Sequence, residues 1–388
     1  MTPAKLSFDA TPVERWIETE LATGRLTGGV LEVCQAGRTA LARNFGVRDQ
    51  AGNPAMRNTA YWIASMTKPI VAVAAMRLIA QGAFALDDPV EKFVPGFGRR
   101  GVLQPDGRSV EANRPPLIRD LMTHLSGLTY GQFGNDAIHA AYMAAGVYDF
   151  ASDNTQMAER LATLPLLHQP GTVFEYGMST DVLGRVIEIA AKAALDDALR
   201  ALVLDPLEMT DTRFIPAPGR LAAVPDTPTV RGLAPPFCEN QSWFSAGGGL
   251  SSTLPDYLRF AEMLLGCGEV GGVRLLSADT FAQMTRNHLP VDVGYGAYTA
   301  TLGTTAPWEA NGLGFGLGLA VRTARRSSKL PGGLGEMLWP GVSGANFWVD
   351  PENTLIAVLL THAPDHRTQH RIDLRNAVYA GLTKCEQR

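Results

Sequence analysis

The stretch Tyr61-Trp62-Ile63-Ala64-Ser65-Met66-Thr67-Lys68 leads directly into the most apolar run of the chain. The spacing of that run predicts a helix from Ser65 to Gln81, ended by Gly82, and Pro69 is compatible with its first turn. Residues three apart share a helix face, so Ser65 and Lys68 would lie side by side at the helix N-terminus. Unpaired amides and partial positive charge at that end can stabilise an oxyanion.

A serine and a lysine in this arrangement indicate nucleophilic catalysis. The alternative is a capping serine followed by a solvated lysine, but the helix that Lys68 begins is too apolar to be exposed. The Gly-x-Ser-x-Gly turn of other serine hydrolases is absent, since Gly341-Val342-Ser343-Gly344-Ala345 lacks its last glycine. Ser65 is therefore the predicted nucleophile, with Lys68 beside it.

Strand patterns are concentrated at the two ends of the chain. They occur at Gly28 to Cys34, Thr39 to Val47, Gly248 to Ser251, Leu313 to Arg322, Ala345 to Val349 and Thr354 to Thr361. Helical patterns occur at Thr11 to Thr23, Ile118 to Thr123, Ala137 to Ala145, Asn154 to Thr163, Thr180 to Ala191, Leu195 to Leu202, Asp256 to Leu265 and Ile372 to Leu382. We expect an α+β protein in which residues 1–82 and 232–388 form a sheet domain and residues 83–231 an inserted helical domain. Ligands commonly bind in the cleft that such an insertion creates.

Composition excludes several classes of protein. The 388 residues are 46% hydrophobic and 19% charged, which is typical of a globular chain, and the net charge is −4. A nucleic-acid partner is not expected, because the chain has no extended basic run. The densest basic cluster, Arg322 to Lys329, is interpreted as a solvated hairpin tip. No apolar stretch approaches the roughly 18 residues that span a bilayer, so no membrane partner is expected either.

The cysteines bear on the compartment of the protein. Four scattered cysteines form no disulfide framework, and the N-terminus has no apolar signal core. Both observations favour a cytoplasmic protein. The oligomeric state stays open.

Several motifs together resemble a known superfamily. Tyr61 to Lys68, Thr123-His124-Leu125-Ser126-Gly127-Leu128, Pro206 to Thr212 and Gly247 to Ser252 follow the order found in the penicillin-recognising serine hydrolases of class C type. Within that branch the chain resembles the family VIII carboxylesterases. The resemblance implies a beta-lactamase/DD-peptidase-like fold, an antiparallel sheet flanked by helices, and spans roughly residues 60 to 360.

The superfamily's second motif, Tyr-x-Asn, corresponds to Tyr176-Gly177-Met178. The resemblance implies that Tyr176 is the general base or a proton shuttle, whereas the alternative is an ordinary core tyrosine. Because tyrosine normally ionises near pH 10, a phenolate base would need the positive charge of Lys68 nearby. A neutral Lys68 acting as base, with Tyr176 as relay, is equally compatible with the sequence. Met178 replaces an amide that binds substrate in lactam-processing relatives, and a thioether is at best a weak acceptor.

The third motif, Lys-Thr-Gly, corresponds to Trp339-Pro340-Gly341. Gly341 is kept, but Trp339 replaces the lysine whose charge binds a substrate carboxylate in lactam-processing relatives. The same resemblance implies an oxyanion hole made of the backbone N–H groups of Ser65 and Val342. Trp339, Gly341 and Met178 are then expected to contact substrate.

Four aromatic residues flank these motifs, namely Tyr130, Phe133, Trp243 and Phe244. They are candidates for the wall of an apolar acyl pocket, with Tyr130 the predicted substrate contact, although core packing explains each equally well. His362, His366 and His370 recur every four residues, but Pro364 interrupts any helix that begins at His362. We therefore predict no metal site.

The sequence thus predicts a carboxylesterase that hydrolyses small acyl esters through a Ser65 acyl-enzyme, without metal or organic cofactor. An acyltransferase or amide hydrolase of the same fold is the nearest alternative. A true beta-lactamase or peptidase is disfavoured by Met178 and Trp339, unless another cation replaces the missing lysine. A catalytically inactive binding protein is disfavoured because Ser65, Lys68 and Tyr176 are all present.

Overall fold

A computed structural model describes residues 8–98, 100–104, 106–231, 237, 241–325 and 330–382. Its centre is a seven-stranded antiparallel sheet in the order β11-β12-β13-β14-β15-β1-β2. The strands are β1 (Gly28–Gln35), β2 (Arg38–Gly46), β11 (Leu313–Phe315), β12 (Ala320–Arg322), β13 (Met337–Leu338), β14 (Asn346–Asp350) and β15 (Leu355–Thr361). Strands from both ends of the sequence share this sheet, as predicted, because β1 pairs with β15 from Gly29↔Thr361 to Gln35↔Leu355.

The burial of each strand follows its position in the sheet. β14 and β15 are buried along their whole length, which agrees with their continuous apolar sequences. β2 lies at the edge and exposes most of its residues. The β1–β2 hairpin turns at Ala36 and Gly37, which both have positive φ.

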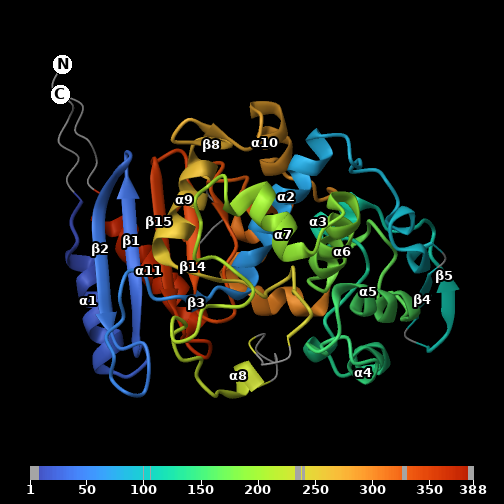
Figure 1. Ribbon diagram of the computed structural model, residues 1–388, viewed down its shortest axis with the longest axis horizontal. Helices are drawn as coiled ribbons and strands as arrows, with labels where there is room; N and C mark the ends of the chain where they lie inside the picture. The colour runs from blue at the N-terminus through green and yellow to red at the C-terminus, as the bar shows by residue number, and fades with distance from the viewer. Residues whose placement is uncertain are drawn as a thin grey trace.

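Helices cover both faces of the sheet (Figure 1). α1 (Thr11–Ala22) and α11 (Arg367–Gly381) pack against each other on one face, and α9 (Leu254–Leu265) packs on β14, β15 and β1 on the other. Phe8 and Leu382 form a β-bridge, so the two ends of the described chain meet. α2 (Thr67–Ala80) lies at the centre of the molecule, where it contacts α6 and α7.

The middle of the chain is mostly helical, as expected. Its helices are α3 (Ile118–Thr123), α4 (Ala137–Ala144), α5 (Asn154–Thr163), α6 (Ser179–Ala191), α7 (Leu195–Leu199) and α8 (Pro228–Arg231). Short strands β4 (Gly101–Leu103) and β5 (Ser109–Glu111) pair with each other, and β6 (Val173–Phe174) pairs with β10 (Gly294–Tyr295). The remaining elements are β3 (Tyr61–Trp62), β7 (Ser251–Ser252), β8 (Glu269–Val270), β9 (Val273–Arg274) and α10 (Ala278–Thr285). The division at residues 82 and 232 into two domains stays a prediction.

Two sequence expectations near the C-terminal strands were wrong. Residues 313–322 form the hairpin β11–β12 rather than one strand, and Gly318 in its turn has a φ of 90°. Arg322 is not at a solvated tip, because its side chain is buried in an ion pair with Glu336. Residues 326–329, including Lys329, lie outside the described residues.

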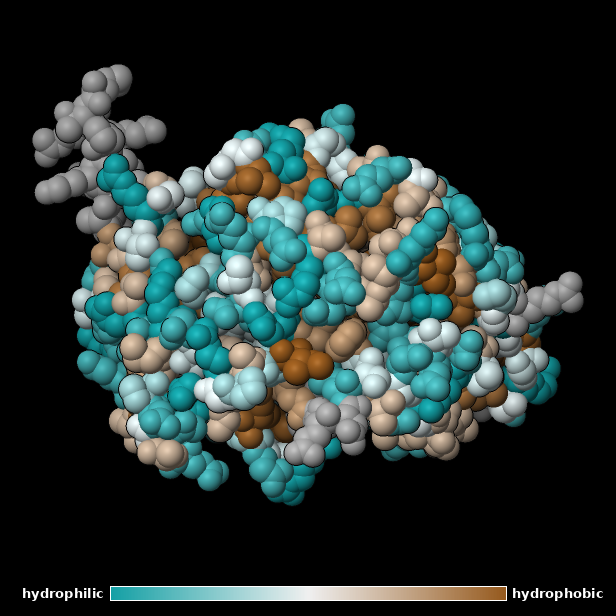
Figure 2. All heavy atoms as spheres, in the orientation of Figure 1, coloured by the Kyte–Doolittle hydropathy of each residue, from teal (hydrophilic) through white to brown (hydrophobic). Residues whose placement is uncertain are grey.

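The surface agrees with a globular chain whose apolar residues are mostly in the core. Figure 2 shows hydrophilic side chains over most of one face, with hydrophobic ones in smaller groups between them. No helix in the described ranges has both the length and the apolar character needed to cross a membrane.

Candidate active site

Ser65 lies in a 3-10 turn, Ala64–Met66, immediately before α2. β3 lies directly before this turn and pairs with β7. This pairing holds the turn in place. Ala64 has a φ of 47°, a left-handed conformation that alanine rarely adopts, and backbone strain of this kind is concentrated at functional sites. The predicted helix therefore begins two residues later than expected, and Ser65 lies on a strained turn at its N-terminus.

Three side chains predicted from two separate motifs meet at this turn. The Tyr176 hydroxyl donates to Ser65 Oγ at 2.6 Å, and Lys68 Nζ donates to the same oxygen at 3.4 Å. Lys68 Nζ also lies 4.7 Å from the centre of the Tyr176 ring. Two groups capable of proton transfer therefore contact one hydroxyl oxygen.

Lys68 is fully buried, with 0% of its surface exposed, and its ammonium is held by polar partners. Nζ donates to the Gly247 carbonyl at 2.6 Å and to the Tyr130 hydroxyl at 3.2 Å. The buried carboxylate of Asp181 accepts from Ser245 Oγ at 2.7 Å and from the Gly247 amide at 3.0 Å. Burial raises the pKa of Asp181, while the Lys68 charge and the two hydrogen bonds oppose that rise. Asp181 thus fixes Gly247, the residue whose carbonyl accepts from Lys68.

Tyr176 is held from two further sides. The Trp339 indole Nε1 donates to Tyr176 Oη at 3.3 Å. The ring of His124 packs on the Tyr176 ring with centroids 4.8 Å apart, and both His124 nitrogens are buried without a partner among the described residues. Burial and the Lys68 charge lower the pKa of His124 well below its usual value, so this imidazole is neutral. Trp339 therefore lines the cleft and also hydrogen-bonds the predicted base, Tyr176.

Tyr130 also contacts Lys68, but its environment differs from that of Tyr176. Burial raises the pKa of Tyr130 well above 10, and the neighbouring Tyr176 and Asp181 raise it further. Its hydroxyl therefore stays protonated at neutral pH. Of the two tyrosines, Tyr176 is the one that hydrogen-bonds Ser65 Oγ, whereas Tyr130 accepts from Lys68.

The proposed oxyanion donors are the backbone amides of Ser65 and Val342. In the 3-10 turn the Met66 amide donates the first hydrogen bond, to the Ile63 carbonyl. The Ser65 amide lies one residue before that donor. The Val342 amide makes no hydrogen bond to any described residue, and Val342 lines the pocket. At Gly341 a Cβ atom would lie 2.4 Å from the Ile63 carbonyl oxygen, so a glycine is needed for this close approach.

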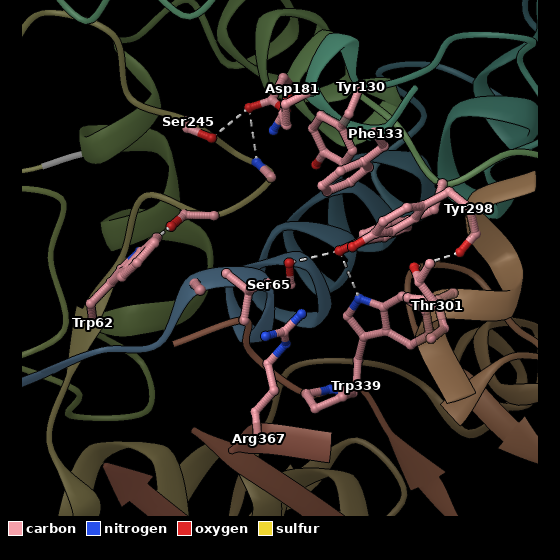
Figure 3. A pocket seen from close by; sticks show the side chains of 18 of the residues that line it. Trp62, Ser65, Tyr130, Phe133, Asp181, Ser245, Tyr298, Thr301, Trp339 and Arg367 are labelled. Carbon is pink, nitrogen blue, oxygen red and sulfur yellow. Dashed lines mark hydrogen bonds between the residues drawn. The ribbon is translucent and has the colours of Figure 1, made fainter. Parts of the chain in front are cut away.

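Ser65, Tyr176, Trp339 and Val342 line a cleft of about 910 Å³, open solvent included (Figure 3). Aromatic side chains form much of its wall, and Phe133 and Tyr298 stack with ring centroids 3.6 Å apart. The aromatic lining residues are Trp62, Tyr130, Phe133, Tyr148, Phe150, Tyr176, Trp243, Tyr298 and Trp339.

Three predicted contacts do not reach the cleft. Met178 precedes α6, is 0% exposed and packs in the core, so the prediction that it contacts substrate was wrong. Phe244 stacks on Phe214 instead of lining the cleft. Gly341 does not line it either; its carbonyl accepts from Arg371 at 2.7 Å.

Several lining residues were not singled out from the sequence. Asp181 and Ser245 form one wall, and Arg367 and Arg371 of α11 lie in the lining as well. No local motif marks these residues, because separate elements bring them together. The histidines noted above do not form a metal site: no group of three potential ligands occurs in the described residues, and His362 binds backbone groups of Trp62 and Ala223.

Comparison with known proteins agrees with this geometry. The Beta-lactamase family profile matches residues 13–381. The chain belongs to the Beta-lactamase family. This member of the family is 30% identical to Esterase EstB of Burkholderia gladioli over 414 aligned positions, which cover 98% of each chain. It is 39% identical to the uncharacterized protein MT1414 of Mycobacterium tuberculosis, covering 88% of this chain and 87% of that one.

Solved structures show the same fold. EstCE1, described as a hydrolase with promiscuous acyltransferase activity, superposes with a TM-score of 0.79 at 27% identity, covering 95% of this chain and 98% of EstCE1. Simvastatin synthase (LovD) of Aspergillus terreus superposes with a TM-score of 0.74 at 20% identity, covering 96% and 99%. The predicted beta-lactamase/DD-peptidase-like fold is confirmed, and the family and its esterase relatives identify a serine hydrolase.

Proposed function

We propose that this chain is a serine carboxylesterase of the family VIII type, which hydrolyses small acyl esters through a Ser65 acyl-enzyme. The observation that carries the proposal is the pair of contacts to Ser65 Oγ, 2.6 Å from Tyr176 Oη and 3.4 Å from Lys68 Nζ. The full-length similarity to Esterase EstB supports an ester as the substrate.

In the proposed reaction Tyr176 is the general base. In its deprotonated form, and with Lys68 beside it, Tyr176 takes the proton from Ser65 while Oγ bonds to the ester carbonyl carbon. The amides of Ser65 and Val342 then stabilise the oxyanion. One such donor contributes about 3 to 4 kcal/mol in the transition state.

The acyl-enzyme forms when the carbon–oxygen bond to the alcohol breaks and Tyr176 returns its proton to the leaving alkoxide. Water then attacks the acyl carbon and gives a proton to Tyr176. The bond between the acyl carbon and Ser65 Oγ breaks, Tyr176 returns the proton to Oγ, and the acid leaves. No step calls on a metal ion or an organic cofactor.

Acyl transfer is a second candidate activity, because EstCE1 is described as having it. In that reaction an alcohol takes the place of water at the acyl-enzyme. The aromatic cleft offers apolar surface on which an alcohol can bind near Ser65.

Hydrolysis of p-nitrophenyl acetate and butyrate tests the proposal. We expect turnover by the native chain and loss of at least about 1,000-fold in kcat for Ser65→Ala. Ser343→Ala, which changes the serine of Gly341-Val342-Ser343-Gly344, is the matched control and keeps its turnover. Adding butanol measures acyl transfer as butyl ester formed. Turnover by Ser65→Ala at the native rate would contradict the proposal.

A further inference from the structure

Two arginines of α11 line the catalytic cleft. Arg367 and Arg371 are four residues apart, so they lie on one face of the helix. Figure 3 shows the Arg367 side chain directed from α11 into the cleft, toward the region of Ser65. Arg371 donates to the Gly341 carbonyl, beside the proposed oxyanion donor Val342. Both cations are therefore close to the reacting centre.

Neither arginine has a carboxylate partner within the described part of the chain. Arg367 donates to the Pro364 carbonyl, and the Nε atom of Arg371 is buried without a hydrogen bond. Arg375, one turn further along α11, differs because its guanidinium is paired with Glu336. Burial, together with the charge of Arg367, lowers the pKa of Arg371 to about 9. Both side chains are half-buried, and a cation that is partly removed from water is stabilised by an anion. This pair is therefore adapted to an anion that the described part of the chain does not provide.

The opposite wall of the cleft holds Asp181, whose charge is offset by the nearby Lys68. Asp181 is the carboxylate among the described lining residues, and it lies with Ser245 across Ser65 from Arg367 in Figure 3. The positive charge of the lining that has no carboxylate beside it among the described residues is therefore at the arginine wall, which attracts an anionic group. The cleft is thus polarised, with the nucleophile between its two walls.

We propose that Arg367 and Arg371 bind a carboxylate carried by the substrate, so that the substrate class is an ester with a free carboxylate on its acyl or its alcohol part. This inference rests on the proposed esterase function. Guanidinium groups bind carboxylates through paired, charge-assisted hydrogen bonds, which a neutral ester cannot form. The arginines replace in function the cation that the sequence lacks at Trp339.

Two matched pairs of esters test the inference. Monomethyl glutarate and methyl valerate differ by a carboxylate in place of a methyl group on the acyl part, and 3-acetoxypropanoate and propyl acetate differ in the same way on the alcohol part. We expect kcat/KM, followed by pH-stat titration, to be about tenfold or more higher for the anionic member of at least one pair. The pair that shows the preference identifies the part of the ester that the arginines bind.

Arg367→Gln is the decisive variant, because Arg371 also holds the Gly341 carbonyl. We expect the ratio of kcat/KM for the anionic over the neutral ester to fall about tenfold or more. Arg15→Gln removes the same charge from an exposed position on α1 and should leave the ratio unchanged. A purely structural role for Arg367 would lower both rates together and keep the ratio.

The experiment distinguishes failure of the proposed carboxylate site from failure of the proposed esterase function. Ser65-dependent hydrolysis without preference for either anionic ester, or with a ratio that Arg367→Gln does not change, overturns the carboxylate site alone. Absence of Ser65-dependent hydrolysis of all four esters overturns the proposed function as well.

Discussion

At the scale of single residues, Tyr176 and Tyr130 offer a direct comparison. Both hydroxyls lie near Lys68, but Tyr176 contacts Ser65 Oγ and the pKa of Tyr130 is raised by burial. We predict that Tyr176→Phe lowers kcat for p-nitrophenyl acetate by about 100-fold or more, because it removes the proton acceptor. Tyr130→Phe is the matched control and should lower kcat less than about tenfold. Equal losses in the two variants would contradict the assignment of Tyr176 as base.

The residues that the sequence could identify are those within local motifs. Ser65 and Lys68 are three residues apart on one turn, so helical geometry alone predicts their proximity. The left-handed φ of Ala64 was not predicted, because alanine gives no signal of that conformation. Met178 was placed wrongly because a motif position does not specify which way its side chain points, and here it points into the core.

At the scale of elements, a buried ionic network joins α11 to the sheet. Glu336, which precedes β13, pairs with Arg322 of β12 and with Arg375 of α11, and all three side chains are at most 5% exposed. We predict that Glu336→Gln lowers the free energy of unfolding by about 3 to 5 kcal/mol, because it leaves two buried guanidinium groups uncompensated. Urea unfolding followed by circular dichroism measures the change.

An exposed ion pair provides the control for that measurement. Asp226 and Arg231 pair at the surface, with side chains 76% and 65% exposed. Asp226→Asn should leave the urea midpoint unchanged, because exposed pairs contribute little. If Glu336→Gln unfolds at the same urea concentration as the native chain, the network does not stabilise the fold as described.

His362 links the end of β15 to the stretch before Ser65. Its Nε2 accepts from the Trp62 amide at 3.0 Å and its Nδ1 bonds to the Ala223 carbonyl at 3.0 Å. Burial lowers the pKa of His362 to about 4. The folded chain therefore binds this proton less readily than the unfolded chain, whose histidine has a pKa of about 6.5. The contribution of neutral His362 to the free energy of unfolding is complete above pH 6.5 and is lost as the pH falls toward 4.

We predict that between pH 7 and pH 5 protonation of this histidine in the unfolded chain lowers the free energy of unfolding by about 2 kcal/mol. His362→Asn cannot titrate, so it should be less stable than the native chain at pH 7 but lose less stability on acidification. Urea unfolding of both proteins at pH 7 and pH 5 gives the two differences. Equal losses in the two proteins would show that His362 does not titrate as described.

Elements were predictable where their periodicity is strong. The helices at residues 118–123 and 154–163 were predicted at their observed limits. The hairpin within residues 313–322 was missed because its apolar residues continue through the turn. Arg322 was assigned to the surface because charged residues usually lie there, whereas the structure provides Glu336 as a buried partner.

At the scale of the whole molecule, the sequence predicted the sheet better than the site. Strands at the two ends of the chain were expected to share one sheet, and they do so through the pairing of β1 with β15. The charged residues of the cleft were not predicted, because Asp181 lies in α6 and Arg367 lies in α11. These two helices are distant in sequence. Tertiary packing alone brings these two charges to opposite sides of Ser65.

The central claim is that Ser65 forms a covalent acyl-enzyme, and labelling of the native chain with a p-nitrophenyl phosphonate tests it most directly. Mass spectrometry of the intact chain should show one added phosphonyl group, and peptide mapping should assign it to Ser65. Ser65→Ala should take up none. A label on another serine, such as Ser343, or equal labelling of Ser65→Ala, would contradict the account.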